Sequence, residues 1–263
     1  MQDTSHFGFS QQTGSVHTKR TIMFTELNTL LNYVGNVQVS SEAYMDSIIR
    51  DNCLGKRSTA TRKYTANYLA NLYMLDSSFL LYRYLHYLWF RDEVSRPVMA
   101  LTCAYARDGL VRDSSRYILN LPLNARPVKA DLEIFIEAIY PGRFGVNMIQ
   151  SLVRNLLSTW TQSGHLKGRI NKIRKRPDVG AGAVVYALFL GYLNGFRGLS
   201  LFESDYVKLL DASKEHMIEL AEEASRRGWF VFKRLENVIE VSFLNFLTQT
   251  EREVIREQNT RAH

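Results

Sequence analysis

A segment that is apolar on nearly every side, residues 79–90, most constrains the fold of this chain. It reads Phe-Leu-Leu-Tyr-Arg-Tyr-Leu-His-Tyr-Leu-Trp-Phe. A helix of this kind is stable only where neighbouring elements cover all of its faces, which indicates the centre of a helical bundle. Amphipathic stretches with capping residues surround it and predict further helices at 21–34, 42–52, 59–75, 96–106 and 110–118. We therefore expect a helical bundle over residues 19–120.

Both ends of this bundle are marked by composition. Residues 1–18 are rich in Ser, Thr, Gln and Gly, which predicts a flexible or loosely docked N-terminus. Two prolines between residues 121 and 127 predict a linker over residues 121–128. The chain offers no signal peptide, and its two cysteines fit a reducing compartment, so a cytoplasmic location is expected.

The second half of the chain predicts a winged-helix-like region over residues 129–247. Periodicity indicates helices at 129–139, 146–162, 181–194 and 213–227. A β-hairpin follows with arms at 229–235 and 238–243, because polar and apolar residues alternate in the second arm. A charged tail, residues 248–263, is expected to continue as a fraying helix. The fold class is therefore mainly α with short β-hairpins.

One uncharged run, residues 179–196, reaches the lower limit of length for a membrane span. It contains four glycines and an asparagine, and we interpret it as a buried helix with close neighbours. No membrane span is expected.

The charge of the chain is positive and unevenly distributed. The formal net charge is +7 and the pI is about 9.4, which points to an acidic partner such as nucleic acid or an anionic membrane surface. Residues 167–176 hold six cations and no acid, whereas residues 201–223 hold seven acids and two lysines. One positive and one negative surface are therefore predicted.

The basic run directly follows the 146–162 helix, and this order is typical of a helix and its wing in DNA-binding proteins. The predicted contacts from the polar side of the helix are Asn147, Gln150, Arg154 and Asn155. The predicted contacts from the wing are Lys167, Arg169, Lys172, Arg174, Lys175 and Arg176. A contact made to phosphates alone would be independent of sequence and strongly dependent on salt. The alternative is a solvated loop whose charges only keep the protein in solution.

A second basic site begins the predicted helix at 59–75, where a turn between two helices gives a helix-turn-helix outline. Amide groups, hydroxyls and cations could meet phosphates there. The candidate residues are Lys56, Arg57, Ser58, Thr59, Thr61, Arg62 and Lys63. The alternative is an ordinary capped helix with exposed cations.

Signals for catalysis are poor. The histidines show no zinc-ligand spacing, and no glycine-rich loop ends in Lys-Ser or Lys-Thr. We therefore expect no enzymatic activity, no metal, no cofactor and no small-molecule substrate.

Four segments, in order along the chain, resemble the BrxA family of bacteriophage exclusion (BREX) systems. They are residues 52–62 (Asn-Cys-Leu-Gly-Lys-Arg-Ser-Thr-Ala-Thr-Arg), 158–166 (Ser-Thr-Trp-Thr-Gln-Ser-Gly-His-Leu), 186–195 (Tyr-Ala-Leu-Phe-Leu-Gly-Tyr-Leu-Asn-Gly) and 239–243 (Ile-Glu-Val-Ser-Phe). The polar N-terminal extension and the overall length depart from the family.

The resemblance implies a non-enzymatic accessory protein of antiphage defence with a NusB-like helical bundle. It implies double-stranded DNA as a partner, together with other BREX components. Two alternatives stay open. The acidic stretch and the second hairpin suit an adaptor that joins defence components, and the NusB likeness suits RNA binding.

Overall fold

Three helices with little exposed surface form the centre of the molecule and contact one another pairwise. The computed structural model describes residues 4–10, 15–236 and 238–261. The central helices are α4 (Leu80–Trp89), α5 (Arg96–Arg107) and α9 (Ala181–Leu193). The expectation that the apolar segment at 79–90 lies inside a helical bundle is confirmed.

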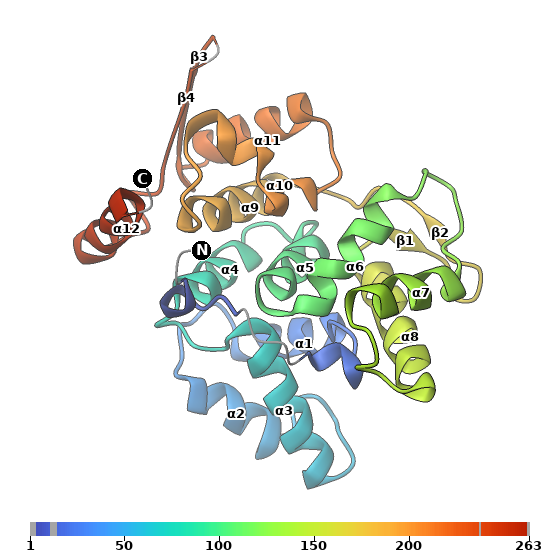
Figure 1. Ribbon diagram of the computed structural model, residues 1–263. Helices are drawn as coiled ribbons and strands as arrows, with labels where there is room; N and C mark the ends of the chain where they lie inside the picture. The colour runs from blue at the N-terminus through green and yellow to red at the C-terminus, as the bar shows by residue number, and fades with distance from the viewer. Residues whose placement is uncertain (1–3, 11–14, 237, 262–263) are drawn as a thin grey trace.

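The remaining helices surround this centre in three groups, which Figure 1 shows below, to the right of and above it. The lower group is α1 (Phe24–Val34), α2 (Ser41–Ile49) and α3 (Thr59–Tyr73). The right-hand group is α6 (Gly109–Asn120), α7 (Lys129–Ile139) and α8 (Val146–Gln162), which contact one another pairwise. The upper group is α10 (Asp205–Lys208) and α11 (Lys214–Arg226), and both pack on α9.

Most of the predicted helices are confirmed, and those for α7 and α8 have the predicted bounds. Capping explains several starts, because Ser58 and Ser213 each accept a hydrogen bond from a backbone N–H in the first turn. The first helix begins three residues later than predicted, since Met23 has a left-handed backbone with φ of 53°. A 3-10 helix, Gly198–Glu203, and the short α10 were not predicted.

Two antiparallel hairpins complete the described fold. The first pairs β1 (Leu166–Lys167) with β2 (Ile173–Arg174) directly after α8. The second pairs β3 (Val231–Leu235) with β4 (Val238–Ser242), and Phe232 lies opposite Val241. Figure 1 shows this second hairpin as an arm that projects from the body, with α12 (Gln249–Arg261) near its foot. The predicted β-hairpin is thus confirmed.

The described residues of the N-terminus pack into the molecule, which differs from the prediction of a flexible segment. Phe7 and Phe9 are part of the hydrophobic core, and His17 is fully buried. These side chains remove apolar surface from water and satisfy buried polar groups, which offsets the entropy that a Ser-rich segment loses.

The proline-containing segment before α7 also makes close contacts. The backbone N–H of Asn124 donates to the carbonyl of Arg174, and the N–H of Arg174 donates to the carbonyl of Ala125. The segment therefore runs along β2, so residues predicted as a linker are fixed to the first hairpin.

Helix α9 is buried along almost its whole length, as predicted for the uncharged run. Among the described helices, none combines the length and the apolar character that a membrane crossing requires.

Candidate nucleic-acid interface

Helix α8 has one buried face and one exposed polar face. Leu152, Leu156 and Trp160 are fully buried, at spacings of four residues that keep them on one side of the helix. The predicted contact residues Asn147, Gln150 and Arg154 are all exposed. Their spacing of three and four residues places them together on the solvent side. The sequence prediction for the location of these three residues is correct. Asn155, the fourth predicted residue, is instead half-buried, and its side-chain amide donates to the backbone carbonyl of His17 at 2.9 Å.

The β1–β2 hairpin follows α8 with a short turn at residues 168–172. Gly168 has φ of 114°, and a Cβ atom there would collide with the carbonyl oxygen of Asn171, so glycine is required. The Lys172 ammonium folds back and donates to the carbonyls of Gly168 and Arg169 at 3.3 and 3.2 Å. The turn therefore has a defined shape, in which Ile170 is 88% exposed.

The hairpin presents several cations to solvent. Lys167, Arg169 and Arg176 are exposed, and Lys172 is half-buried. Burial and, after it, the positive charge of nearby Lys129 lower the pKa of Lys172. The start of α7 therefore adds positive charge beside the hairpin. Lys129 was missed at the level of sequence because its approach to Lys172 depends on how α7 packs against the hairpin.

Arg174 does not belong to this surface, and the prediction that it contacts DNA is wrong. Its side chain is 1% exposed and forms an ion pair with Asp211 at 2.6 Å. Its guanidinium also donates to the carbonyl oxygens of Ile118 and His165, at 3.0 and 3.3 Å. Arg174 therefore fixes the hairpin to α6 and to the segment before α11.

Lys175 is half-buried beside this anchor. Its backbone N–H donates to the carbonyl of His165, and its ammonium donates to the side-chain oxygen of Asn124 at 2.7 Å. Of the six cations in the basic run, Lys167, Arg169 and Arg176 are thus the most available for phosphates.

The start of α3 is likewise divided between structural and exposed residues. Lys56 forms an ion pair with Glu26 at 2.9 Å, and Arg62 donates to the carbonyls of Lys56 and Ile49. These contacts hold the turn between α2 and α3. The Ser58 hydroxyl accepts from the Thr61 N–H as the helix cap. The exposed members of the predicted set are Arg57, Ser58, Thr59, Thr61 and Lys63.

The two basic sites lie in different parts of the molecule. In Figure 1 the start of α3 is at the bottom and the β1–β2 hairpin is at the right, with α8 between them in this view. The polar face of α8 and the hairpin that follows it are joined directly through contacts between α8 and β1.

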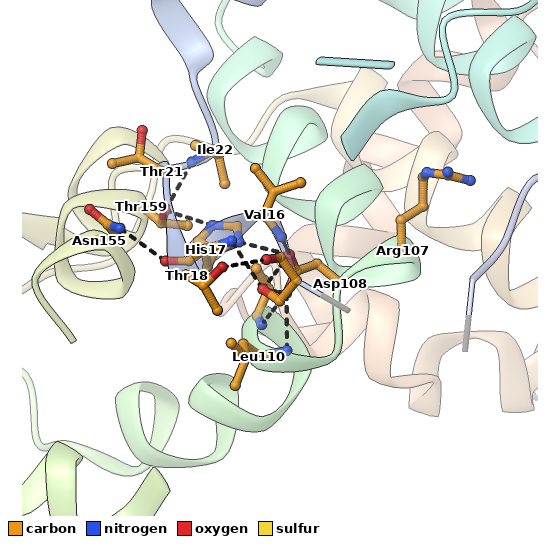
Figure 2. A network of polar contacts seen from close by, with 12 residues as sticks. Val16, His17, Thr18, Thr21, Ile22, Arg107, Asp108, Leu110, Asn155 and Thr159 are labelled. Atoms are coloured by element: carbon orange, nitrogen blue, oxygen red, sulfur yellow. Dashed lines mark hydrogen bonds and ion pairs between the residues drawn. The ribbon is translucent and has the colours of Figure 1, made fainter. Parts of the chain in front are cut away.

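A buried chain of polar contacts links the N-terminus to α6 and α8, and Figure 2 shows it from close by. Asp108 is 2.9 Å from Nδ1 of His17, and Nε2 of His17 is 2.9 Å from the Thr159 hydroxyl. An acid, a histidine and a hydroxyl in this order also occur in nucleophilic catalysis. Here His17 and Thr159 have no exposed surface, and the Thr159 oxygen already accepts from the Ile22 N–H. The arrangement therefore fixes residues 15–22 and offers no access to a substrate.

Asp108 is the centre of this network. It caps α6 by accepting from the N–H groups of Leu110 and Val111, and it accepts from the Ser15 hydroxyl. Burial alone would raise the pKa of Asp108, but the interactions with His17 and Ser15 outweigh burial and lower it. The carboxylate is thus held in its charged form.

No protein-family model matches this chain, and no curated protein matches it either. Within the described residues, no group of three or more His, Cys, Asp and Glu side chains is arranged to hold a metal ion.

Proposed function

We propose that this protein binds double-stranded DNA through phosphate contacts made by α8 and the β1–β2 hairpin. The exposed polar face of α8, followed at once by a hairpin with exposed cations, carries the proposal. Helices α6, α7 and α8 with this hairpin have the order of elements of a winged helix, and a helix with its wing is a frequent means of gripping a duplex. Asn147, Gln150 and Arg154 would face the groove, and Lys167, Arg169 and Arg176 would face phosphates.

The start of α3 provides a second contact in this proposal. Arg57 and Lys63 are exposed there beside the first turn of a helix, whose N–H groups favour anions. Contacts of this kind carry no sequence information, so the expected binding is largely independent of base sequence.

A titration of duplex DNA at several salt concentrations tests the proposal. Arg169→Glu with Arg176→Glu is expected to reduce affinity by about ten- to a hundredfold and to make the salt dependence less steep, by about one unit of log–log slope for each lost phosphate contact. Arg226→Glu, an exposed cation near the end of α11, is the matched control and should leave binding unchanged.

Unchanged affinity and slope in a folded Arg169/Arg176 variant would exclude the hairpin as a DNA contact. Single-stranded DNA and RNA serve as competitors in the same titration. Stronger competition by RNA than by duplex DNA would favour the RNA-binding alternative.

The resemblance to the BrxA family adds a cellular role to this proposal, namely an accessory protein of antiphage defence. Cells that carry the complete defence system with the Arg169/Arg176 variant should lose protection against phage, measured as efficiency of plating. Full protection by a variant that no longer binds DNA would separate the defence role from DNA binding.

A further inference from the structure

A groove with an apolar floor and an acidic rim lies between α11 and the β3–β4 arm, with a volume of about 310 Å³. Ile218 of α11 and Ile239 of β4 line it and are almost buried. Four glutamates also line it, namely Glu215, Glu219, Glu222 and Glu236, against the two cations Lys214 and Arg234. The groove therefore suits an apolar side chain that is flanked by positive charges.

The tip of the β1–β2 hairpin has the complementary chemistry. Ile170 is 88% exposed, the largest exposed fraction among the large apolar side chains of the described residues. Arg169 precedes it, and Lys167 lies exposed at the end of β1. The tip therefore matches the groove, because its apolar side chain can cover the apolar floor while its cations face the glutamates.

The tip and the groove cannot meet within one molecule. Figure 1 shows the β1–β2 hairpin at the right of the body, and the arm with α11 above it and toward the opposite side. The hairpin is also fixed in place by the buried Arg174 and its ion pair with Asp211. A contact between the two surfaces therefore requires two molecules.

We propose that the β1–β2 tip of one copy of this chain docks in the α11–arm groove of a second copy. Ile170 covers the apolar floor, and Lys167 and Arg169 face the glutamates. The two surfaces differ, so each added copy leaves one tip and one groove unoccupied, and the association is head-to-tail. The contact is small and charged, so it is weak and is screened by salt.

The tip also belongs to the proposed DNA interface, and this gives a consequence that rests on the proposed function. A tip held in a groove is not available to phosphates. DNA and the neighbouring copy therefore compete for the same cations, and duplex DNA should shorten the head-to-tail assemblies.

Sedimentation velocity of the full chain over a range of concentrations tests the proposal. At low salt the average mass should rise above the monomer mass of 30.4 kDa with increasing concentration, and it should return to that value at high salt. Glu219→Lys with Glu222→Lys changes the groove, and Lys167→Glu with Arg169→Glu changes the tip. Each variant alone is expected to associate at least about tenfold more weakly, since like charges then meet.

A mixture of the two variants gives the sharpest test. The reversed groove of one variant is complementary to the reversed tip of the other, and the same holds for their unchanged surfaces, so the mixture should associate again. Glu42→Lys with Glu253→Lys reverses two exposed acids outside the groove and is the matched control. Thermal unfolding of each variant verifies that it is folded.

Three results would overturn the proposal. They are a mass of 30.4 kDa at every concentration in low salt, an association that both reversals leave unchanged, and a mixture that stays monomeric. A groove that binds a different defence protein while the chain stays monomeric would favour the adaptor instead. Glu219→Gln with Glu222→Gln removes the acids of the groove and adds no cation, so the DNA affinity of this variant reports on the proposed function separately from self-association.

Discussion

Each of the two hairpins of this protein comes directly after a helix. The two hairpins differ in the charge around them and in the contacts that fix them to the body. The β1–β2 hairpin follows α8, whose single charged residue is Arg154, and it carries exposed cations. The β3–β4 arm follows α11, which carries Glu215, Glu219, Glu222 and Glu223. The same local architecture therefore carries exposed cations at one position and an acidic helix at the other.

The anchors of the two hairpins differ as well. Arg174 holds the first through an ion pair and hydrogen bonds, beside the buried His165. The foot of the second is held by aromatic packing, in which the Phe243 ring lies 4.9 Å from Phe189 and 5.5 Å from Phe230. The stability that a polar anchor provides should depend on pH and on charge. The stability that an aromatic anchor provides should depend on the volume of the side chains that fill it.

The largest expected difference between the two anchors is in how their contribution to the free energy of unfolding changes at acidic pH. Burial lowers the pKa of His165 to about 3. Its ring Nε2–H donates a hydrogen bond to the Leu209 carbonyl, and its Nδ1 is hydrogen-bonded to the Ser163 hydroxyl. The unfolded chain binds a proton at this histidine below pH about 6.5 and the folded chain does not. Stability is therefore lost as pH falls from 6.5 toward 3, by several kcal/mol, because one pKa unit corresponds to about 1.4 kcal/mol.

Urea unfolding of the wild type and of His165→Gln across this pH range measures how much His165 contributes to the pH dependence of the free energy of unfolding. The variant is expected to be less stable at pH 7 but to lose less stability in acid. Parallel curves for the two proteins would show that His165 is not responsible.

Removal of the aromatic anchor is the next largest change. Phe243→Ala should lower the free energy of unfolding by about 3–5 kcal/mol, since it leaves a cavity among Tyr84, Phe189 and Phe230. Its loss of stability should be equal at pH 7 and pH 5, in contrast to the behaviour of the first hairpin. Denaturant unfolding at both pH values checks this, and a strongly pH-dependent loss would contradict the contrast.

Removal of the polar anchor should cost somewhat less. Arg174→Ala leaves the half-buried Asp211 without its ion-pair partner and removes one donor each from the carbonyls of Ile118 and His165, and we expect a loss of about 3 kcal/mol. Arg176→Ala, in which an exposed neighbour is changed, is the matched control and should shift stability by less than about 0.5 kcal/mol. Equal effects of the two substitutions, measured by denaturant unfolding, would refute the distinction between anchor and surface.

The smallest effect is expected at the tip of the arm. Leu235 and Val238 are 77% and 70% exposed, so Leu235→Ser should change the free energy of unfolding by less than about 0.5 kcal/mol. Thermal unfolding measures this. A loss above about 1 kcal/mol would mean that these two side chains are packed against other residues.

Local features of the sequence were sufficient to predict much of the fold. The bounds of α7 and α8 follow from periodicity and breaks, and the exposure of Asn147, Gln150 and Arg154 follows from helix geometry. The burial of Arg174 could not be predicted in this way. Its partners Ile118 and Asp211 are 56 and 37 residues away in sequence, and a cation in a basic run gives no local sign of them.

The packing of the N-terminus was missed for the same reason. Ser15 and His17 lie in a polar stretch, and their packing depends on contacts with Asp108 and Thr159. The composition of a segment predicts whether the segment can fold in isolation. Its burial in the protein depends instead on the groups that the rest of the chain provides.

The contact between His17 and Thr159 spans 142 residues, and this has a consequence for the order of synthesis. The ribosome produces residues 15–22 well before α8, yet their binding site is incomplete until α8 has emerged. This segment can therefore take its native position only after a part of the chain that is made much later. Early α-helical pairs such as α2 and α3 can form during translation, whereas docking of the N-terminus has to wait for a distant part of the chain and is expected to be a late, slow step.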